Sequence, residues 1–282
     1  MPPLEVDRAA IRAHLALLFA WVDWSDPDYA DCGIAIRGVG EKDTPAAGKP
    51  AESIFLPVGA AAASDAPDDT TLEALTRVVA DHAARWAAND FAAYIVPAVM
   101  RDGANAGESN VIAFSTICVD IDDGDTTMML ARAESALGQA SMVIHSGGQT
   151  KTRKQKIHAY WRLSELAAGD DVRRVARARH KLALAIGGDV SFQRLPQVIR
   201  IAGSIHGKGG QKRPVIVIED RPAAYDLSDL EAAIDDLLPV SGAKSLDTEG
   251  GLKFMPTESM QSVLTTDVHE GGVDRTRFEN VS

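Results

Sequence analysis

The stretch NVIAFSTICVDID (residues 110–122) decides the architecture that this sequence predicts. In its second half apolar and polar residues alternate, so that the isoleucines and the second valine share one face of a strand and Asp120 and Asp122 share the other. Two carboxylates about 4 to 6 Å apart repel each other by roughly 3 to 4 kcal/mol at an effective dielectric of about 20, so the pair favours a counter-charge. Mg²⁺ and Mn²⁺ prefer such oxygen ligands. The stretch therefore predicts a strand that ends in a metal site, the alternative being a pair of solvated acids before a turn.

Alternating helical and strand-like segments surround this strand. The periodicity of apolar residues predicts helices over 6–22, 71–88, 126–138, 170–186 and 226–238, and further strands over 33–39, 52–58, 91–99, 141–146, 156–163 and 214–220. The first two strands are expected to form a hairpin. The mixture predicts an α/β (α+β) fold with a mixed sheet. Because residues 239–282 are polar and weakly periodic, we expect a folded domain over 1–238 and a linker or tail after it.

Composition excludes several classes of protein. Of 282 residues, 45% are hydrophobic and 24% are charged, which is typical of a globular protein rather than a disordered one. No apolar run approaches the roughly 18 residues of a membrane span. The first residues show no secretory signal, so we expect a cytoplasmic protein in which Cys32 and Cys118 are free thiols.

Charge is unevenly distributed along the chain. The formal net charge is -11, yet residues 150–221 hold 16 Lys and Arg against 6 Asp and Glu. Within this basic segment, the predicted helix VRRVARARHKLALA presents Arg173, Arg174, Arg177 and Lys181 at near-helical spacing. These cations are expected either to follow the backbone of a nucleic acid or to form a solvated helix face.

A second cluster lies in HSGGQTKTRKQK (145–156) and in the strand KIHAYWRL that continues from it. The Gly-Gly turn and the following cations can offer N–H groups and positive charge to phosphate oxygens. Alternation places Lys156, His158, Tyr160 and Arg162 on the polar side of this strand. A lone strand histidine is more often structural than functional, so the argument depends on the neighbouring motifs.

The third cluster is GGDVSFQRLPQVIRIAGSIHGK (187–208). Asp189 follows a glycine pair, and Arg200, His206 and Lys208 flank a strand-like VIRIAGS. Taken alone, this cluster is a turn, a strand and another turn in which Asp189 caps local backbone groups.

In this order, CVDID, then SGG with KIHAYW, then GGDVS with RIAGSIHGK resemble the three motifs of the archaeo-eukaryotic primase superfamily. The similarity covers about residues 30–220 and is greatest to the plasmid and phage primase-polymerases, which include RepB-like replication primases. It implies that Asp120, Asp122 and Asp189 are the catalytic acids that bind two metal ions, and that His158 contacts the incoming nucleotide.

The resemblance implies a DNA-templated nucleotidyltransferase that makes primers by two-metal-ion catalysis with Mg²⁺ or Mn²⁺. Its fold would be a primase catalytic core, with an RRM-like unit over about 101–238 packed on an N-terminal α/β unit over about 1–100. The expected partners are single-stranded DNA, NTP or dNTP, and a replicative helicase, separate or fused. The residues expected to bind the nucleotide besides His158 are Ser146, Gly147, Gly148, Lys156, Arg200 and Lys208.

Two other functions compete with this interpretation. One is a DNA-binding replication initiator that has lost catalysis, although the intact acids and His158 argue against it. The other is a phosphatase, because DIDDGDTT resembles the Asp-x-Asp-x-Thr motif of haloacid-dehalogenase-type enzymes. In that register Gly124 occupies the position that needs Thr or Val, and the second and third clusters stay unexplained.

Overall fold

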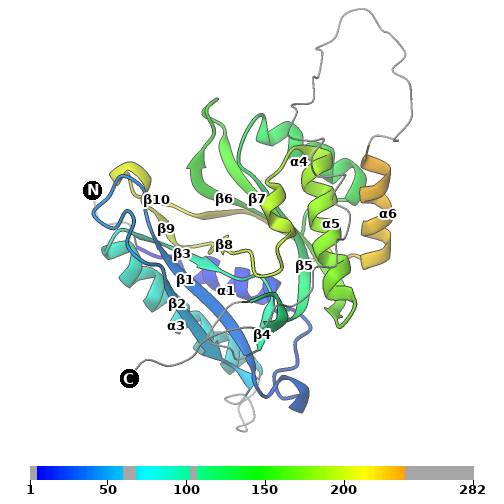
Figure 1. Ribbon diagram of the computed structural model, residues 1–282, viewed down its shortest axis with the longest axis horizontal. Coiled ribbons are helices and arrows are strands. Elements are labelled where there is room, and N and C mark those ends of the chain that lie inside the picture. Colours follow the sequence, from blue (N-terminus) through cyan, green and yellow to red (C-terminus); the bar gives the residue numbers. More distant parts are fainter. Residues whose placement is uncertain (1–4, 60–67, 102–106, 239–282) are drawn as a thin grey trace, which may run out of the picture. The chain divides into compact units, whose positions relative to one another are not determined.

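A computed structural model describes residues 5–59, 68–101 and 107–238, so the predicted tail at 239–282 lies outside the described residues (Figure 1). The helices are α1 (Arg8–Leu18), α3 (Asp68–Ala88), α4 (Thr126–Leu137), α5 (Asp171–Ile186) and α6 (Leu227–Leu237). The strands are β1 (Cys32–Gly40), β2 (Glu52–Pro57), β3 (Phe91–Ile95), β4 (Val99–Arg101), β5 (Val111–Ile121), β6 (Met142–Gln149), β7 (Gln155–Ala168), β8 (Ile199–Arg200), β9 (Ile205–His206), β10 (Arg213–Pro214) and β11 (Ile216–Asp220). The 3₁₀ helices are η1 (Pro27–Tyr29), η2 (Glu108–Asn110), η3 (Val190–Gln193) and η4 (Lys208–Gly210).

A nine-stranded sheet organises the domain, in the order β11-β6-β7-β5-β4-β1-β3-β8, with β2 paired to β1. Strands β9 and β10 form a separate pair. The α+β class is confirmed, as is the first hairpin, in which β1 and β2 pair from Gly33↔Pro57 to Gly38↔Glu52. We expected a mixed sheet, but every described pair in it is antiparallel. The reason is that β7 lies between β5 and β6, so the two strands that α4 connects do not pair with each other.

The predicted strand over 91–99 is two strands in the structure. Pro97 lies between β3 and β4 and has no N–H to donate, so a continuous ladder ends there. The break sends β3 to pair with β1 and β8, whereas β4 pairs with β1 and β5. Strand β4 thereby joins the N-terminal strands to those that carry the aspartates.

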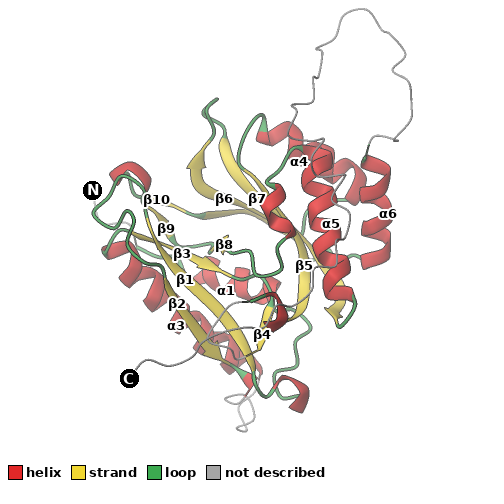
Figure 2. Cartoon of the chain, viewed as in Figure 1, coloured by secondary structure: helices red, strands yellow, loops and turns green. Residues whose placement is uncertain are grey.

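Two apolar cores lie on opposite faces of β5, as the alternation in ICVDID predicts. Ile117, Val119 and Ile121 belong to the core that contains residues of α4, α5 and α6. Cys118 belongs to the core that contains residues of α1 and α3. Figure 2 shows α4, α5 and α6 together, apart from α1 and α3.

The prediction that the even-numbered residues of KIHAYWRL face a polar surface is wrong for two of them. Tyr160 and His158 are buried, because α1 covers this part of the sheet. The Nε2 atom of His14 in α1 lies 3.0 Å from the Tyr160 hydroxyl, and His14 Nδ1 accepts a hydrogen bond from the N–H of Ala202. Burial lowers the pKa of His14 to about 3, so this link is neutral.

Some boundaries differ from the prediction. Helix α1 ends at Leu18, although the periodicity of apolar residues continues to residue 22. Of the strand-like VIRIAGS, only Ile199 and Arg200 pair as β8. Cys32 and Cys118 are free thiols, as predicted. Among the described residues, no helix is both long and apolar enough to span a membrane.

Candidate active site

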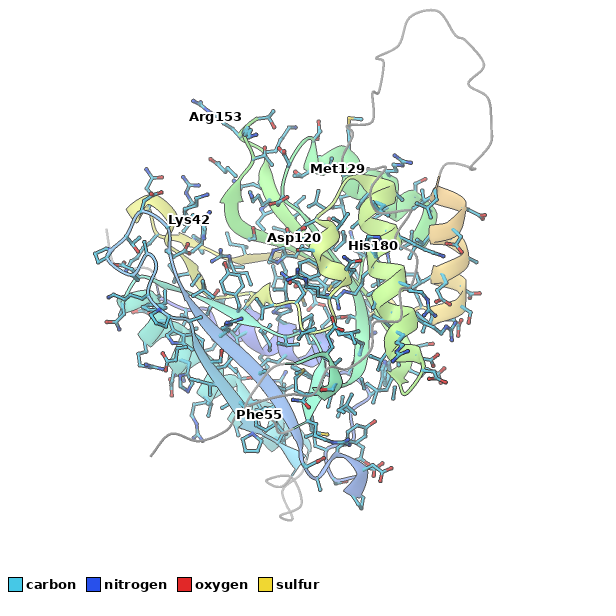
Figure 3. All side chains as sticks on the ribbon, in the orientation of Figure 1. Lys42, Phe55, Asp120, Met129, Arg153 and His180 are labelled. Carbon is cyan, nitrogen blue, oxygen red and sulfur yellow. The ribbon has the colours of Figure 1, made fainter. Side chains whose placement is uncertain are left out.

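The three predicted acids lie near the end of β5. Asp120 is the penultimate residue of β5 (Figure 3). Asp122 directly follows the strand. Asp189 approaches from the segment after α5, and its N–H donates a hydrogen bond of 2.8 Å to the carbonyl oxygen of Asp120. A Cβ atom on Gly188 would lie 2.8 Å from Val119 and 2.9 Å from that carbonyl. The second glycine of GGD is therefore needed for the close approach of this segment to β5.

Asp120 carries the most perturbed carboxylate of this group. Burial raises its pKa, the negative charges of Asp122 and Asp189 raise it further, and the result is about 7 even though Lys156 and Arg200 act in the opposite direction. Its Oδ1 atom is buried and has no hydrogen-bond partner among the described residues. A buried carboxylate oxygen with no donor, next to two more carboxylates, favours the binding of a cation.

The other two carboxylates have partners. Asp122 accepts a hydrogen bond of 3.1 Å from Lys156 Nζ, and Asp189 accepts from the N–H and hydroxyl groups of Ser191. Across the described chain, no three metal-ligating side chains are close enough together to form a complete ligand set. The donor chemistry and the unpartnered Asp120 oxygen nevertheless fit a hard divalent cation. Asp122 would have to release Lys156 to join it.

His158 lies directly beside Asp120, because the two residues are paired between β5 and β7. Its Nε2 atom is 3.6 Å from Asp120 Oδ1. Burial, followed by the positive charge of Arg200, lowers the pKa of His158 well below its usual value, so the imidazole is neutral. His158 is not among the residues that line the neighbouring cavity, and its contact with a nucleotide stays a prediction.

A cavity of about 440 Å³ opens beside these residues, between the N-terminal strands and the β6–β7 hairpin. Five of the predicted nucleotide-binding residues line it, namely Ser146, Gly148, Lys156, Arg200 and Lys208. The other lining residues are Val39, Gly40, Glu41, Lys42, Tyr94, Gln149, His206 and Arg213. Five cationic side chains thus surround one space, next to the carboxylates. The cations at 151–154, in contrast, are outside the lining.

The predicted Gly147 supports this cavity from behind. It has a φ of +79°, and a Cβ atom at this position would lie 2.7 Å from the Cβ of His206. Glycine is therefore needed both for its backbone conformation and for the close packing of β6 against β9.

Sequence reasoning missed Glu41, which is buried in the wall of the cavity. Its Oε1 atom lies 3.2 Å from Arg200 Nη1 and 3.0 Å from His206 Nδ1, and it accepts a hydrogen bond of 2.9 Å from the N–H of Gly207. Arg200 also donates to the hydroxyl of Tyr94 and lies over its ring. The sequence carries no signal for these contacts, because their members are 159 or more residues apart from Glu41.

Electrostatics explain why Glu41 stays charged in a buried position. Burial acts to raise its pKa, but the contacts with His206, Arg200 and the Gly207 N–H outweigh burial and lower the pKa to about 2. The carboxylate thus holds Arg200 and His206 in place at the cavity wall.

The four cations predicted to bind DNA differ in their surroundings. Arg174 is paired with Asp171 and with Glu231 of α6, and Lys181 is paired with Asp235 of α6. Arg173 and Arg177 are exposed. Two of the four therefore connect α5 to α6, and DNA binding by this helix stays a prediction.

Comparison with known proteins identifies the fold. No family model matches the sequence, and no curated protein does. Among solved structures, the chain is similar to the AEP domain of the cyanophage S-2L primase-polymerase, with a TM-score of 0.55 and 19% identity over 82% of this chain and 100% of that one. Weaker similarity links it to primase RepB′ (TM-score 0.46, 13% identity, 81% of this chain and 62% of that one). The catalytic domain of RepB′ in complex with initiator DNA scores the same, over 82% and 94%.

The first of these similarities spans the whole of the matched domain and most of this chain. We conclude that this chain has the fold of the AEP domain of that primase-polymerase.

Proposed function

We propose that the protein is a primase that joins nucleotides on a single-stranded DNA template during plasmid or phage replication. The observation that carries this proposal is the cavity with five cationic side chains beside the Asp120, Asp122 and Asp189 carboxylates. A nucleoside triphosphate combines a highly charged anion with a sugar and a base, and the size and charge of the cavity suit it. The similarity to a primase-polymerase domain supports the same conclusion.

The residues of the cavity would divide the work. Lys156, Arg200 and Lys208 would hold the triphosphate and stabilise the charge that develops on the leaving pyrophosphate. Glu41 would keep Arg200 oriented through the contact described above. The hydroxyl of Ser146 and the backbone of Gly148 line the same space and would complete the binding of phosphate oxygens.

Asp120, Asp122 and Asp189 are the residues that would hold Mg²⁺ or Mn²⁺. When bound, these ions would lower the pKa of the attacking 3′-hydroxyl and offset phosphate charge. The three carboxylates would orient that site, and the neutral His158 would pack against Asp120 without competing for it as a cation.

The test is primer synthesis on unprimed single-stranded DNA with labelled nucleotides and Mg²⁺ or Mn²⁺. The wild type is expected to make products, and the double variant Asp120→Ala/Asp122→Ala to make none. Asp123→Ala is the matched control, because Asp123 is an exposed acid next to the site and its variant should keep activity.

Activity in the double variant would overturn the metal-site assignment. If the wild type also made no product, extension of a ready-made primer would show a polymerase that needs help to initiate. Silence in both assays would instead favour the DNA-binding initiator.

A further inference from the structure

The cavity of about 440 Å³, which we propose binds the nucleotide, is called the nucleotide cavity below. A second cavity, of about 220 Å³, lies further along β1. Strands β1 and β2 form one wall, and the segment after η3 forms the other. We call it the β1 groove, and its lining residues are Ala35, Ile36, Arg37, Ser53, Val96, Arg194, Pro196, Gln197 and Val198. None of them belongs to the site described above.

Two arginines from different elements face this groove. Arg37 comes from β1 and Arg194 from the segment after η3, and both are exposed. In the described part of the chain, neither arginine forms an ion pair or a side-chain hydrogen bond. In contrast, Arg174 and Lys181 on α5 are paired with acids. In an acidic protein, two uncompensated guanidinium groups at one groove indicate an anionic ligand.

The groove adjoins the nucleotide cavity. Arg37 pairs with Tyr94 on β3, and Tyr94 pairs with Arg200 on β8, so these three side chains form one row on the same face of the sheet. Arg37 lines the groove, whereas Tyr94 and Arg200 line the nucleotide cavity. Val39, which also lines the cavity, is two residues from Arg37, or about 7 Å along the strand.

The groove also adjoins the catalytic acids along the chain. Arg194 directly follows η3, and Asp189 is the N-cap residue of that same turn. A single strand of DNA bound in the groove would therefore pass close to both the proposed nucleotide position and the carboxylates. Besides the arginines, the hydroxyl of Ser53 and the amide of Gln197 offer hydrogen bonds to a polynucleotide, and Pro196 offers an apolar contact.

We propose that the β1 groove binds the phosphodiester backbone of the single-stranded DNA template, through Arg37 and Arg194, next to the nucleotide cavity. This proposal rests on the proposed function. It assigns the template to a surface other than the α5 cations.

The test is fluorescence anisotropy of labelled single-stranded DNA over a series of salt concentrations, with Arg37→Gln/Arg194→Gln. Each lost phosphate contact reduces the slope of log K against log salt by about 0.7, so the double variant should lose up to about 1.4 of the wild-type slope. The matched control is Arg77→Gln/Arg132→Gln, which removes the same two charges from exposed positions on α3 and α4 and should keep the wild-type slope.

Two further measurements make the result decisive. Binding of labelled nucleotide in the presence of Mn²⁺ should stay at the wild-type level in the groove variant, because the nucleotide cavity is intact. Arg173→Gln/Arg177→Gln tests the competing α5 surface. A wild-type slope in the groove variant, or an equal loss in the Arg77/Arg132 control, would overturn the proposal. A loss confined to the α5 variant would do the same.

Failure of this proposal is distinguishable from failure of the proposed function. DNA binding is measured without catalysis. If the wild type makes no primers but the groove variant shows the reduced salt slope, the groove proposal stands and the primase proposal fails. If the wild type makes primers but the groove variant binds DNA with the wild-type slope, the primase proposal stands and the groove proposal fails.

Discussion

Glu41 shows how much a single residue contributes when it balances a buried arginine. Its carboxylate faces Arg200, His206 and the N–H of Gly207 through one oxygen atom. Removing the charge would leave Arg200 and His206 without their acidic partner in a buried wall. Glu41 therefore contributes both to the stability of the fold and to the arrangement of Arg200 and His206 in the cavity wall.

We expect Glu41→Gln to lower the free energy of unfolding at pH 7 by about 3 kcal/mol. This magnitude corresponds to the reduction of the Glu41 pKa from 4.5 to about 2 on folding. Because the folded pKa is depressed, this stabilisation is complete above pH 4.5 and is lost as the pH falls to about 2. Urea unfolding at pH 7, 4 and 2.5 measures it. A difference between variant and wild type that did not shrink at pH 2.5 would contradict the assignment.

Asp120 presents the opposite case, since its folded pKa is raised to about 7. The folded protein then holds a proton that the unfolded chain has released, so the wild type loses stability as the pH rises from about 4 through 7. We expect Asp120→Asn to raise the free energy of unfolding at pH 8 by about 2 kcal/mol and to abolish primer synthesis. The magnitude allows for a side chain that is 23% exposed.

Urea unfolding at pH 5 and pH 8 in the presence of a chelator checks this expectation. The stability gain should be larger at pH 8, and the exposed Asp123→Asn should show no such dependence. Equal stability of Asp120→Asn and the wild type at pH 8 would mean that the charge of the buried Asp120 carboxylate does not destabilise the folded protein.

At the scale of elements, the β6 strand depends on Gly147. Gly147→Ala should destabilise the protein by about 2 kcal/mol and raise the KM for nucleotide, because the added Cβ meets His206 and the backbone is left-handed. Gly169→Ala is the control, since Gly169 has a φ of +61° and an added Cβ would have no atom of the described chain within 4 Å. That variant should lose stability without a change in KM. Thermal unfolding and steady-state kinetics separate the two effects, and a wild-type KM in Gly147→Ala would contradict the expectation.

Most elements follow from local patterns in the sequence. Two short runs rich in β-forming residues at 33–39 and 52–58, separated by a loop rich in glycine, proline and lysine, predicted the first hairpin. The pattern of 170–186 predicted α5. The break at Pro97 was missed, although the missing N–H was its signal. The polar face of KIHAYWRL was misjudged because the sequence does not show that α1 folds over it.

The residues of the candidate site divide in the same way, into those that local motifs identify and those that depend on contacts between distant segments. The motifs identified Lys156, Arg200 and Lys208, all of which line the cavity. They did not identify Glu41, which depends on a contact across 159 residues. Pairing between distant strands is set by the whole sheet, so no local pattern reports it.

At the scale of the whole molecule, every residue of the proposed site and of the β1 groove lies within the described chain. A protein that ends after residue 238 is therefore expected to unfold at the wild-type temperature and to keep primer synthesis. Thermal unfolding and the primer assay on the shortened and full chains test this. Loss of synthesis with unchanged unfolding would assign a role in the reaction to residues 239–282.

The strand order has a consequence for folding during translation. Strand β3 has β1 on one side and waits for β8 on the other, yet β8 is translated about a hundred residues later. On the ribosome, the outer edge of β3 thus offers unpaired N–H and C=O groups to any other extended chain. The wall of the nucleotide cavity also lacks Arg200 and His206 during that interval. The proposed nucleotide cavity is therefore complete only after β8 and β9 have been made.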